Sequence, residues 1–271
     1  MFPLRSDIYT DSYRYLLPAT LSKRFVHAAA AIVVAGMACA AGGAEVTVSA
    51  AASLTTAFKE LAPLFTAANP GVVVRLNFGA SGALLQQMAA GAPVDVFASA
   101  DVETMDQAQS RKLIDATWRR DFAANTLVLV VPAAASAAPN TLADLARPEF
   151  ARIAIGWPAS VPVGRYAKGA LEAAGLWARI EPKTIGAGNV RQALDYVARG
   201  EVDAGFVYAT DAALMAGKVR VALTVPTATP LLYPVAPVAG SANLTLARRF
   251  VVFLSSEAAR SVLSRHGFGA P

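Results

Sequence analysis

Strand-like apolar runs alternate with helix-like amphipathic runs along most of this chain, and this alternation restricts the fold more than any other feature. Residues 46–50 (VTVSA) predict a buried strand, and residues 54–68 predict a helix because their apolar side chains recur on one face. The other predicted strands are residues 72–78, 94–98, 127–132, 152–156, 204–208 and 219–225. The other predicted helices are residues 81–91, 102–111, 164–174, 190–199, 244–254 and 257–265. Such alternation predicts an α/β protein with helices on both faces of its sheets.

Two segments divide these elements into two lobes. Residues 127–132 form the most hydrophobic run and are interpreted as a crossing into a second lobe, while residues 232–238 are interpreted as the return. The predicted division is residues 1–44 for an N-terminal extension and signal peptide, 45–125 and 231–271 for lobe 1, and 126–230 for lobe 2. Each lobe is predicted to contain a mixed, mostly parallel sheet flanked by helices. A ligand would bind in the cleft between the lobes, where strand carboxyl ends and helix amino ends meet.

Three short segments centred on hydroxyl groups follow apolar runs: residues 50–54 (AAASL), 78–82 (FGASG) and 207–211 (VYATD). The first two lead directly into predicted helices. A serine in the first turn of a helix places its hydroxyl beside free backbone amides, which is a favourable arrangement for an anion. None of the three segments contains Lys or Arg. The pattern therefore predicts a small dianion held by hydrogen bonds alone.

Charge and composition restrict the function classes. The chain has 271 residues, of which 55% are hydrophobic, more than in an average soluble domain, and only 16% are charged. Alanine and valine supply much of the hydrophobic excess, which we interpret as a globular α/β protein with tightly packed helices. The formal net charge of +5 comes from basic residues that are dispersed along the sequence, so no nucleic-acid partner is predicted.

The N-terminal segment has the features of a secretory signal peptide. Lys23 and Arg24 precede the apolar residues 25–38, and residues 38–40 (ACA) have the small-x-small form of a cleavage site, with residues 42–44 (GGA) as a second candidate. A membrane anchor is the alternative, but the run is short and rich in alanine. We therefore predict export to the periplasm.

The single cysteine, Cys39, lies at this cleavage region. Cleavage would remove it and leave no thiol or disulfide chemistry, whereas a lipoprotein site would attach a lipid to it. His27 would leave with the signal peptide, so that His266 would be the remaining histidine.

Five segments in sequence order carry a resemblance to a known family: residues 48–54, 91–97, 161–168, 205–208 and 265–269. Over residues 45–271 the chain resembles the periplasmic molybdate-binding proteins of ABC-type importers, which have the type II periplasmic binding-protein fold. The resemblance implies an importer permease and ATPase as partners, a monomer, molybdate and tungstate as ligands, and no cofactor. Another tetrahedral oxyanion such as sulfate is the alternative ligand.

The resemblance also implies a ligand set. The oxyanion would be held by the hydroxyl and amide of Ser53 and of Ser81, by the amides of Val163 and Val190, and by the hydroxyl of Tyr208. Each of the first four lies where a helix is predicted to start, so that helix amino ends would converge on the anion. Tyr208 ends a predicted strand and would supply a neutral donor.

Several of these residues have a simpler structural interpretation. Ser53 and Ser81 would then be ordinary N-caps, and Tyr208 a half-buried aromatic residue of the core. Asp211 is interpreted as the cap of the next helix, with orientation of Tyr208 as a second hypothesis. Arg165 is expected to point to solvent, with a charge just behind the anion site as the alternative.

Other motifs are rejected. Residues 186–188 (GAG) lack the third glycine of a dinucleotide fingerprint, and residues 79–82 lack the lysine of a P-loop. Of the acidic residues Asp95, Asp101 and Glu103, we interpret Asp101 as an N-cap rather than a metal ligand. An isolated His266 cannot form a zinc site.

Catalysis and gene regulation are also disfavoured. A nucleophilic Ser53 or Ser81 would need a neighbouring base, and neither serine lies in a Gly-x-Ser-x-Gly context. A ligand-sensing transcription regulator would need a DNA-binding segment, and residues 1–44 contain none that we identify. We therefore predict a binding protein rather than an enzyme.

Overall fold

The computed structural model of the protein describes residues 43–271, which form one compact unit. The predicted signal segment up to residue 42, including Cys39, lies outside the described residues. None of the helices between residues 43 and 271 is long and apolar enough to cross a lipid bilayer.

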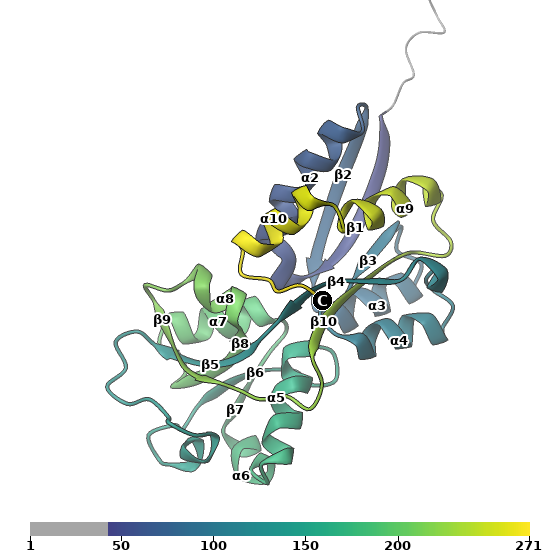
Figure 1. The fold of residues 1–271 in the computed structure, drawn as a ribbon. Helices are drawn as coiled ribbons and strands as arrows, with labels where there is room; N and C mark the ends of the chain where they lie inside the picture. Colours follow the sequence, from purple (N-terminus) through teal and green to yellow (C-terminus); the bar gives the residue numbers. More distant parts are fainter. Residues whose placement is uncertain (1–42) are drawn as a thin grey trace, which may run out of the picture. The chain divides into compact units, whose positions relative to one another are not determined.

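Two five-stranded sheets form the framework of this unit (Figure 1). The first sheet has the order β2 (Val72–Gly79), β1 (Ala44–Ala51), β3 (Val96–Ala98), β10 (Leu231–Pro237), β4 (Arg120–Asn125). The second has the order β7 (Thr184–Ala187), β6 (Ile153–Gly156), β8 (Ala204–Tyr208), β5 (Leu127–Pro132), β9 (Val219–Thr224). Each sheet combines two parallel and two antiparallel strand pairings. The predicted two-lobed α/β fold with mixed sheets is confirmed, but the sheets are not mostly parallel, because β10 and β5 each pair antiparallel with both of their neighbours.

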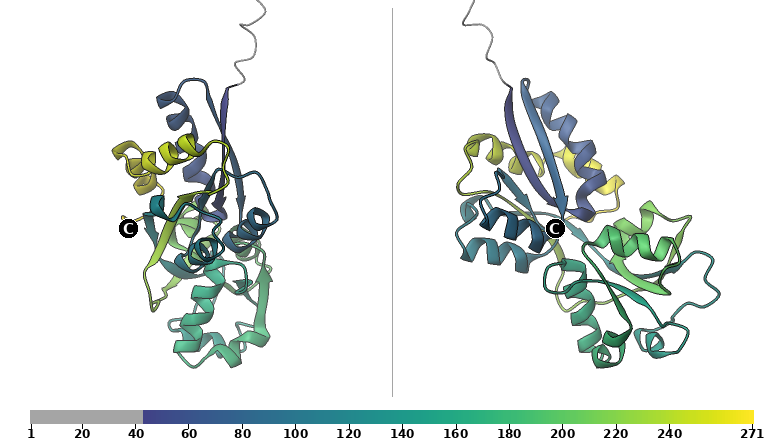
Figure 2. Two further views of the ribbon diagram at one scale, coloured as in Figure 1. Left: turned by 90° about the vertical axis from the view of Figure 1, so that its right-hand side faces the viewer. Right: turned by 180° about the vertical axis from the view of Figure 1, so that it is seen from behind.

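Helices flank both sheets. Those of the first lobe are α2 (Thr55–Ala68), α3 (Ser81–Ala89), α4 (Val102–Ser110), α9 (Leu244–Phe253) and α10 (Glu257–Arg265). Those of the second are α5 (Pro162–Ala173), α6 (Trp177–Ile180), α7 (Val190–Ala198) and α8 (Ala209–Leu214). In the first lobe α2 lies beside α10, and α3 lies beside α4 (Figure 1 and Figure 2). Short 3-10 turns complete the structure: η1 (Ala52–Leu54), η2 (Ala116–Trp118), η3 (Leu142–Ala146) and η4 (Glu181–Lys183).

Alternation along β3 explains why helices cover both faces of the first sheet. Val96 and Ala98 belong to the larger core cluster, together with Phe58 of α2. Phe97, between them, belongs to a separate cluster with Leu84 of α3. Because successive side chains of a strand point to opposite faces, all three residues are fully buried without sharing a core.

Two strands differ from the prediction. β4 and β7 were not expected from the sequence, since only Phe122 and Ala123 of β4 and Ala187 of β7 are buried. The return segment forms β10, which pairs antiparallel with both β3 and β4. The chain thus passes between the sheets at residue 126 and again at residues 225–230.

Candidate anion-binding site

The five residues expected to hold an oxyanion line one small cavity: Ser53, Ser81, Val163, Val190 and Tyr208. The space open to the centre of a water-sized sphere is only about 10 Å³, so the cavity is very small. The other lining residues are Ala51, Ala52, Gly79, Ala80, Ala100, Val161, Pro162 and Asn189. None of these described lining residues carries a charged side chain. The structure therefore brings all five residues together in a neutral site that suits only a small ligand.

Helix amino ends supply backbone donors to this cavity. Ser81 is the first residue of α3, Val163 the second of α5 and Val190 the first of α7. Amides in the first turn of a helix have no acceptor within the helix, and no acceptor for these three occurs among residues 43–271. Three helix dipoles therefore direct their positive ends toward one point.

Strand ends complete the wall. Ala51 is the last residue of β1, Gly79 the last of β2 and Tyr208 the last of β8. The cavity consequently lies where strand carboxyl ends of both sheets meet helix amino ends, which is the usual ligand position in open α/β sheets.

The hydroxyl of Ser53 is oriented by two residues that sequence analysis did not identify. Ser53 lies in η1, and its Oγ is 3.0 Å from the hydroxyl of Tyr233. Asn125 Nδ2 donates to that same tyrosine oxygen at 3.1 Å. The tyrosine oxygen accepts from Asn125 and its proton can be donated to Ser53 Oγ, an arrangement that leaves the serine proton for the cavity.

Ser81 is oriented in a similar way. Its Oγ accepts a hydrogen bond from the amide of Ala100 at 3.0 Å, which leaves its own proton free to donate. Neither serine caps a helix through its side chain, because the N-cap residues of η1 and α3 are Ala51 and Ala80. The N-cap interpretation of Ser53 and Ser81 is therefore wrong.

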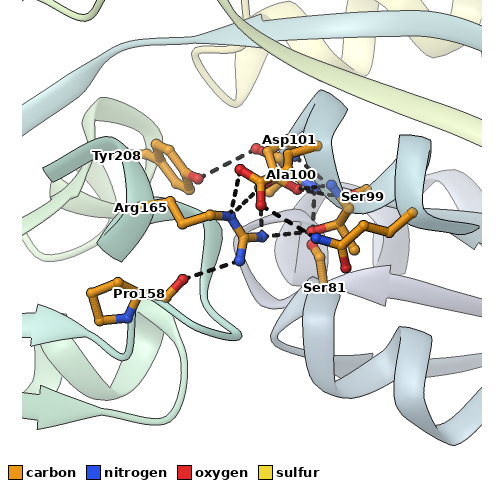
Figure 3. Close-up of polar contacts among 10 residues, drawn as sticks. Ser81, Ser99, Ala100, Asp101, Pro158, Arg165 and Tyr208 are labelled. Atoms are coloured by element: carbon orange, nitrogen blue, oxygen red, sulfur yellow. Dashed lines mark hydrogen bonds and ion pairs between the residues drawn. The ribbon is translucent and has the colours of Figure 1, made fainter. Parts of the chain in front are cut away.

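Tyr208 is both a core residue and a cavity residue. Its side chain is almost completely buried, with its ring 5.8 Å from that of Tyr233. Its hydroxyl donates to the carbonyl of Ala100 at a long 3.4 Å (Figure 3). Burial raises the pKa of Tyr208 well above its usual range, so the group remains a neutral donor.

Arg165 does not point to solvent, contrary to the sequence-based expectation. Its guanidinium contacts Asp101 through Nη2 at 2.6 Å and through Nε at 2.9 Å (Figure 3). Arg165 belongs to α5 of the second lobe, whereas Asp101 belongs to the first. The carboxylate also accepts from the amide of Thr104 at 3.2 Å, which confirms Asp101 as the N-cap of α4.

Asp211 does not occupy the N-cap position either. Tyr208 is the N-cap of α8, and Asp211 is its third residue, fully buried and 2.5 Å from Nε of Arg191. Burial raises the pKa of Asp211 to about 6, against the opposing effect of the Arg191 charge. The hydroxyl of Tyr208 bonds to Ala100 instead, so the hypothesis of a hydroxyl–carboxylate bond to Asp211 is not supported.

Asn189 and Arg191 are further residues that the sequence analysis missed. Asn189 caps α7, since its Oδ1 accepts from the amides of Arg191 at 2.9 Å and Gln192 at 3.1 Å. This cap leaves the amide of Val190 free for the cavity. An asparagine before a helical run is a recognised start signal and would have identified it. Arg191 also donates to the carbonyl of Ser53, in the other lobe, at 3.2 Å.

The lobes are in contact around the cavity. The amide of Gly82 donates to the carbonyl of Ser160 in the other lobe at 3.0 Å. A Cβ at position 82 would lie only 2.7 Å from that oxygen, so this approach requires glycine. The described structure is thus a closed arrangement of the two lobes.

Metal ligation by side chains has no basis in the described part of the chain, where no group of three His, Cys, Asp or Glu residues could hold an ion. His266 instead lies with its Nε2 2.8 Å from Oε2 of Glu60. The cavity chemistry is that of hydroxyl and amide donors, which suits an anion with many acceptor atoms.

Known proteins resemble this chain over most of its length. The profile of the family described as bacterial extracellular solute-binding protein matches residues 46–269. The molybdate-binding protein ModA of Escherichia coli is 39% identical over 250 residues, covering 90% of this chain and 96% of ModA.

Solved structures share the fold. The periplasmic molybdate-binding protein of Azotobacter vinelandii has a TM-score of 0.71 at 24% identity, with 83% of this chain and 99% of that one covered. The sulfate-binding protein SubI of Mycobacterium tuberculosis has a TM-score of 0.75 at 22% identity, covering 83% and 86%. The chain belongs to the family of bacterial extracellular solute-binding proteins.

Proposed function

We propose that this protein captures molybdate, and also tungstate, outside the cytoplasmic membrane and delivers it to the permease and ATPase of an ABC importer. The resemblance to molybdate-binding proteins is confirmed by the 39% identity to ModA over nearly the full length of both chains. The oxyanion ligands proposed are Ser53, Ser81, Val163, Val190 and Tyr208. Export by the N-terminal signal peptide and action as a monomer are part of this proposal.

One observation supports this proposal most directly: the described residues that line the cavity offer hydrogen-bond donors and no charged side chain. Molybdate is a full dianion near neutral pH, so each of its oxygens can accept a hydrogen bond. Three helix amino ends supply partial positive charge, and these dipoles already point at the cavity before the anion binds, so they need not reorient. A neutral site of this kind favours a dianion that needs only donors.

The hydroxyl orientations disfavour protonated anions. Ser81 uses its oxygen to accept from the amide of Ala100, and Ser53 can accept from Tyr233 in a similar way. Ser81 therefore presents its proton to the cavity, Ser53 can do the same, and Tyr208 can donate to a ligand once its proton turns away from the carbonyl of Ala100. Hydrogen phosphate carries a proton that needs an acceptor, and its burial without one is costly.

Sulfate remains the second candidate, because it is a dianion of the same shape. The likeness to the sulfate-binding protein SubI is one of fold, at 22% identity, whereas the relation to ModA extends through the sequence. Molybdate and sulfate differ in size, so the test must compare them directly.

A binding role without catalysis agrees with the site chemistry. Among the described residues that line the cavity none is a histidine, lysine or carboxylate that could act as a general base. The oxygen of Ser81 already accepts a hydrogen bond from the amide of Ala100, which further reduces its nucleophilic character.

Isothermal titration calorimetry of the purified protein with molybdate, tungstate, sulfate and phosphate tests the proposal. We expect tight binding of the first two and weak or no binding of the others. Ser53→Ala and Ser81→Ala should each weaken molybdate binding, while the control Ser110→Ala, on the exposed end of α4, should not. Heat with sulfate but none with molybdate would overturn the assignment.

A further inference from the structure

Arg165 joins the two lobes on one side of the cavity. From α5 it reaches Asp101 of the first lobe, and its Nη2 also lies 2.6 Å from Oγ1 of Thr104. Its Nη1 donates to the carbonyl of Pro158, within the second lobe, at 3.1 Å. The guanidinium is therefore held by its own lobe while it binds the other (Figure 3).

This ion pair is unusual in its burial. The side chain of Arg165 is 16% exposed and that of Asp101 only 4% exposed. Most exposed ion pairs contribute little to stability, whereas breaking a buried, hydrogen-bonded pair leaves an uncompensated charge. Since the partners belong to different lobes, opening of the cleft must break the pair.

The segment at Asp101 also orients the cavity hydroxyls. Ala100, which precedes it, donates its amide to Ser81 Oγ at 3.0 Å and accepts from the hydroxyl of Tyr208 at 3.4 Å. Ser99 Oγ donates to the second carboxylate oxygen of Asp101 at 3.1 Å. Fixing Asp101 therefore fixes the backbone atoms that hold two of the proposed ligand groups.

We propose that the Arg165–Asp101 pair is a latch that keeps the lobes closed over the bound anion and sets the rate of its release. Arg165 contacts no ligand atom in this scheme and is a positioning residue. The inference rests on the proposed function, since the anion used to measure release is molybdate. Because the pair forms only after the lobes meet, its loss should change the dissociation rate and leave the association rate nearly unchanged.

Stopped-flow fluorescence with molybdate, using the tryptophans of the protein, provides the test. We expect Arg165→Gln to raise the dissociation rate about tenfold or more, with the association rate within about twofold of wild type. Arg165→Lys should give an intermediate rate, because an ammonium cannot form the forked contact to the carboxylate and Thr104. Asp101→Asn should act like Arg165→Gln, since asparagine retains the capacity to cap α4 but lacks the charge.

The matched control is Arg147→Gln, which breaks the exposed Arg147–Glu149 pair within the second lobe. It should leave both rates unchanged, and thermal melting should show that all variants are folded. An unchanged dissociation rate in both Arg165→Gln and Asp101→Asn would overturn the latch. So would an equal increase in the Arg147→Gln control.

The choice of anion separates this proposal from the functional one. If wild type binds sulfate or phosphate but not molybdate, the proposed function fails, and the latch then predicts faster release of that bound anion from Arg165→Gln than from wild type. Equal release rates in that comparison would reject the latch independently of the identity of the anion.

Discussion

The hydroxyl of Tyr233 lies 3.0 Å from Oγ of Ser53, although 180 positions separate these residues in the chain. Tyr233 is on β10, the strand that returns from the second lobe, and Ser53 follows β1 of the first. The return crossing thus contributes a group that is hydrogen-bonded to a hydroxyl proposed to bind the anion. Asn125, at the end of the outgoing strand β4, completes this chain of donors at 3.1 Å.

Replacing Tyr233 by phenylalanine should weaken molybdate binding and reduce discrimination against hydrogen phosphate. Without the tyrosine proton, Ser53 Oγ can turn its own proton away from the cavity and accept from the ligand. A single hydrogen bond contributes about 0.5–1.5 kcal/mol, so we expect a roughly twofold to tenfold loss of molybdate affinity. Calorimetry with both anions measures the effect, and Tyr196→Phe on α7 is the control. An unchanged ratio of the two affinities would contradict the donor chain.

Gly82→Ala should prevent full closure of the lobes. The added Cβ would meet the carbonyl oxygen of Ser160 at 2.7 Å and its Cα at 2.8 Å, both backbone atoms of the other lobe. Overpacking costs about 1–3 kcal/mol, which corresponds to a loss of affinity of roughly fivefold to 150-fold. Gly169→Ala on α5 is the matched control, because no atom lies within 4 Å of its Cβ position. The control should bind molybdate normally and gain about 1 kcal/mol of stability.

Glu60→Gln should reduce the loss of folding stability that occurs as the pH becomes acidic. Hydrogen bonds from His266 and Arg265 lower the pKa of Glu60, which joins α2 to α10. A carboxylate with a lowered folded-state pKa stabilises the fold above its unfolded pKa, and that contribution is lost as the pH falls through the folded value. The melting temperature of the variant should therefore fall less than that of wild type between about pH 5 and about pH 3. An equal fall in the melting temperatures of the two proteins would show this interpretation to be wrong.

Most elements could be predicted from the sequence because their hydrophobic periodicity agrees with their burial. The helix over Thr55–Ala68 has Phe58, Leu61 and Phe65 buried on one face, at the spacing that predicted it. β4 failed this criterion, since it is an edge strand in which exposed Arg120 and Asp121 precede only two buried residues. β7 is also an edge strand and has one buried residue, Ala187, so neither had a pattern to detect.

Only those features of the candidate site that depend on local sequence patterns could be predicted. The helix starts at Ser81 and Val190 follow from local pattern, and the structure places both at the cavity. Contacts between lobes depend on the tertiary arrangement, which no local pattern encodes. The positions of Arg191 and Ser53 are 138 residues apart, and the arginine was missed for that reason. Arg165 was placed in solvent because its partner, Asp101, lies in the other lobe.

Asp211 should make molybdate affinity rise as the pH falls. Its folded-state pKa is about 6, and it pairs with Arg191, one residue beyond the proposed ligand Val190. A bound dianion disfavours a nearby carboxylate, so binding should raise this pKa further and take up a proton between about pH 5.5 and about pH 7.5. By linkage, affinity should be several-fold higher at the lower pH, where the carboxyl is neutral and the Arg191 charge is no longer compensated. Calorimetry in buffers of different ionisation enthalpy counts the protons directly. Asp211→Asn should abolish both the proton uptake and the dependence of molybdate affinity on pH. If the affinity of the variant still changes with pH, another group is responsible for the titration.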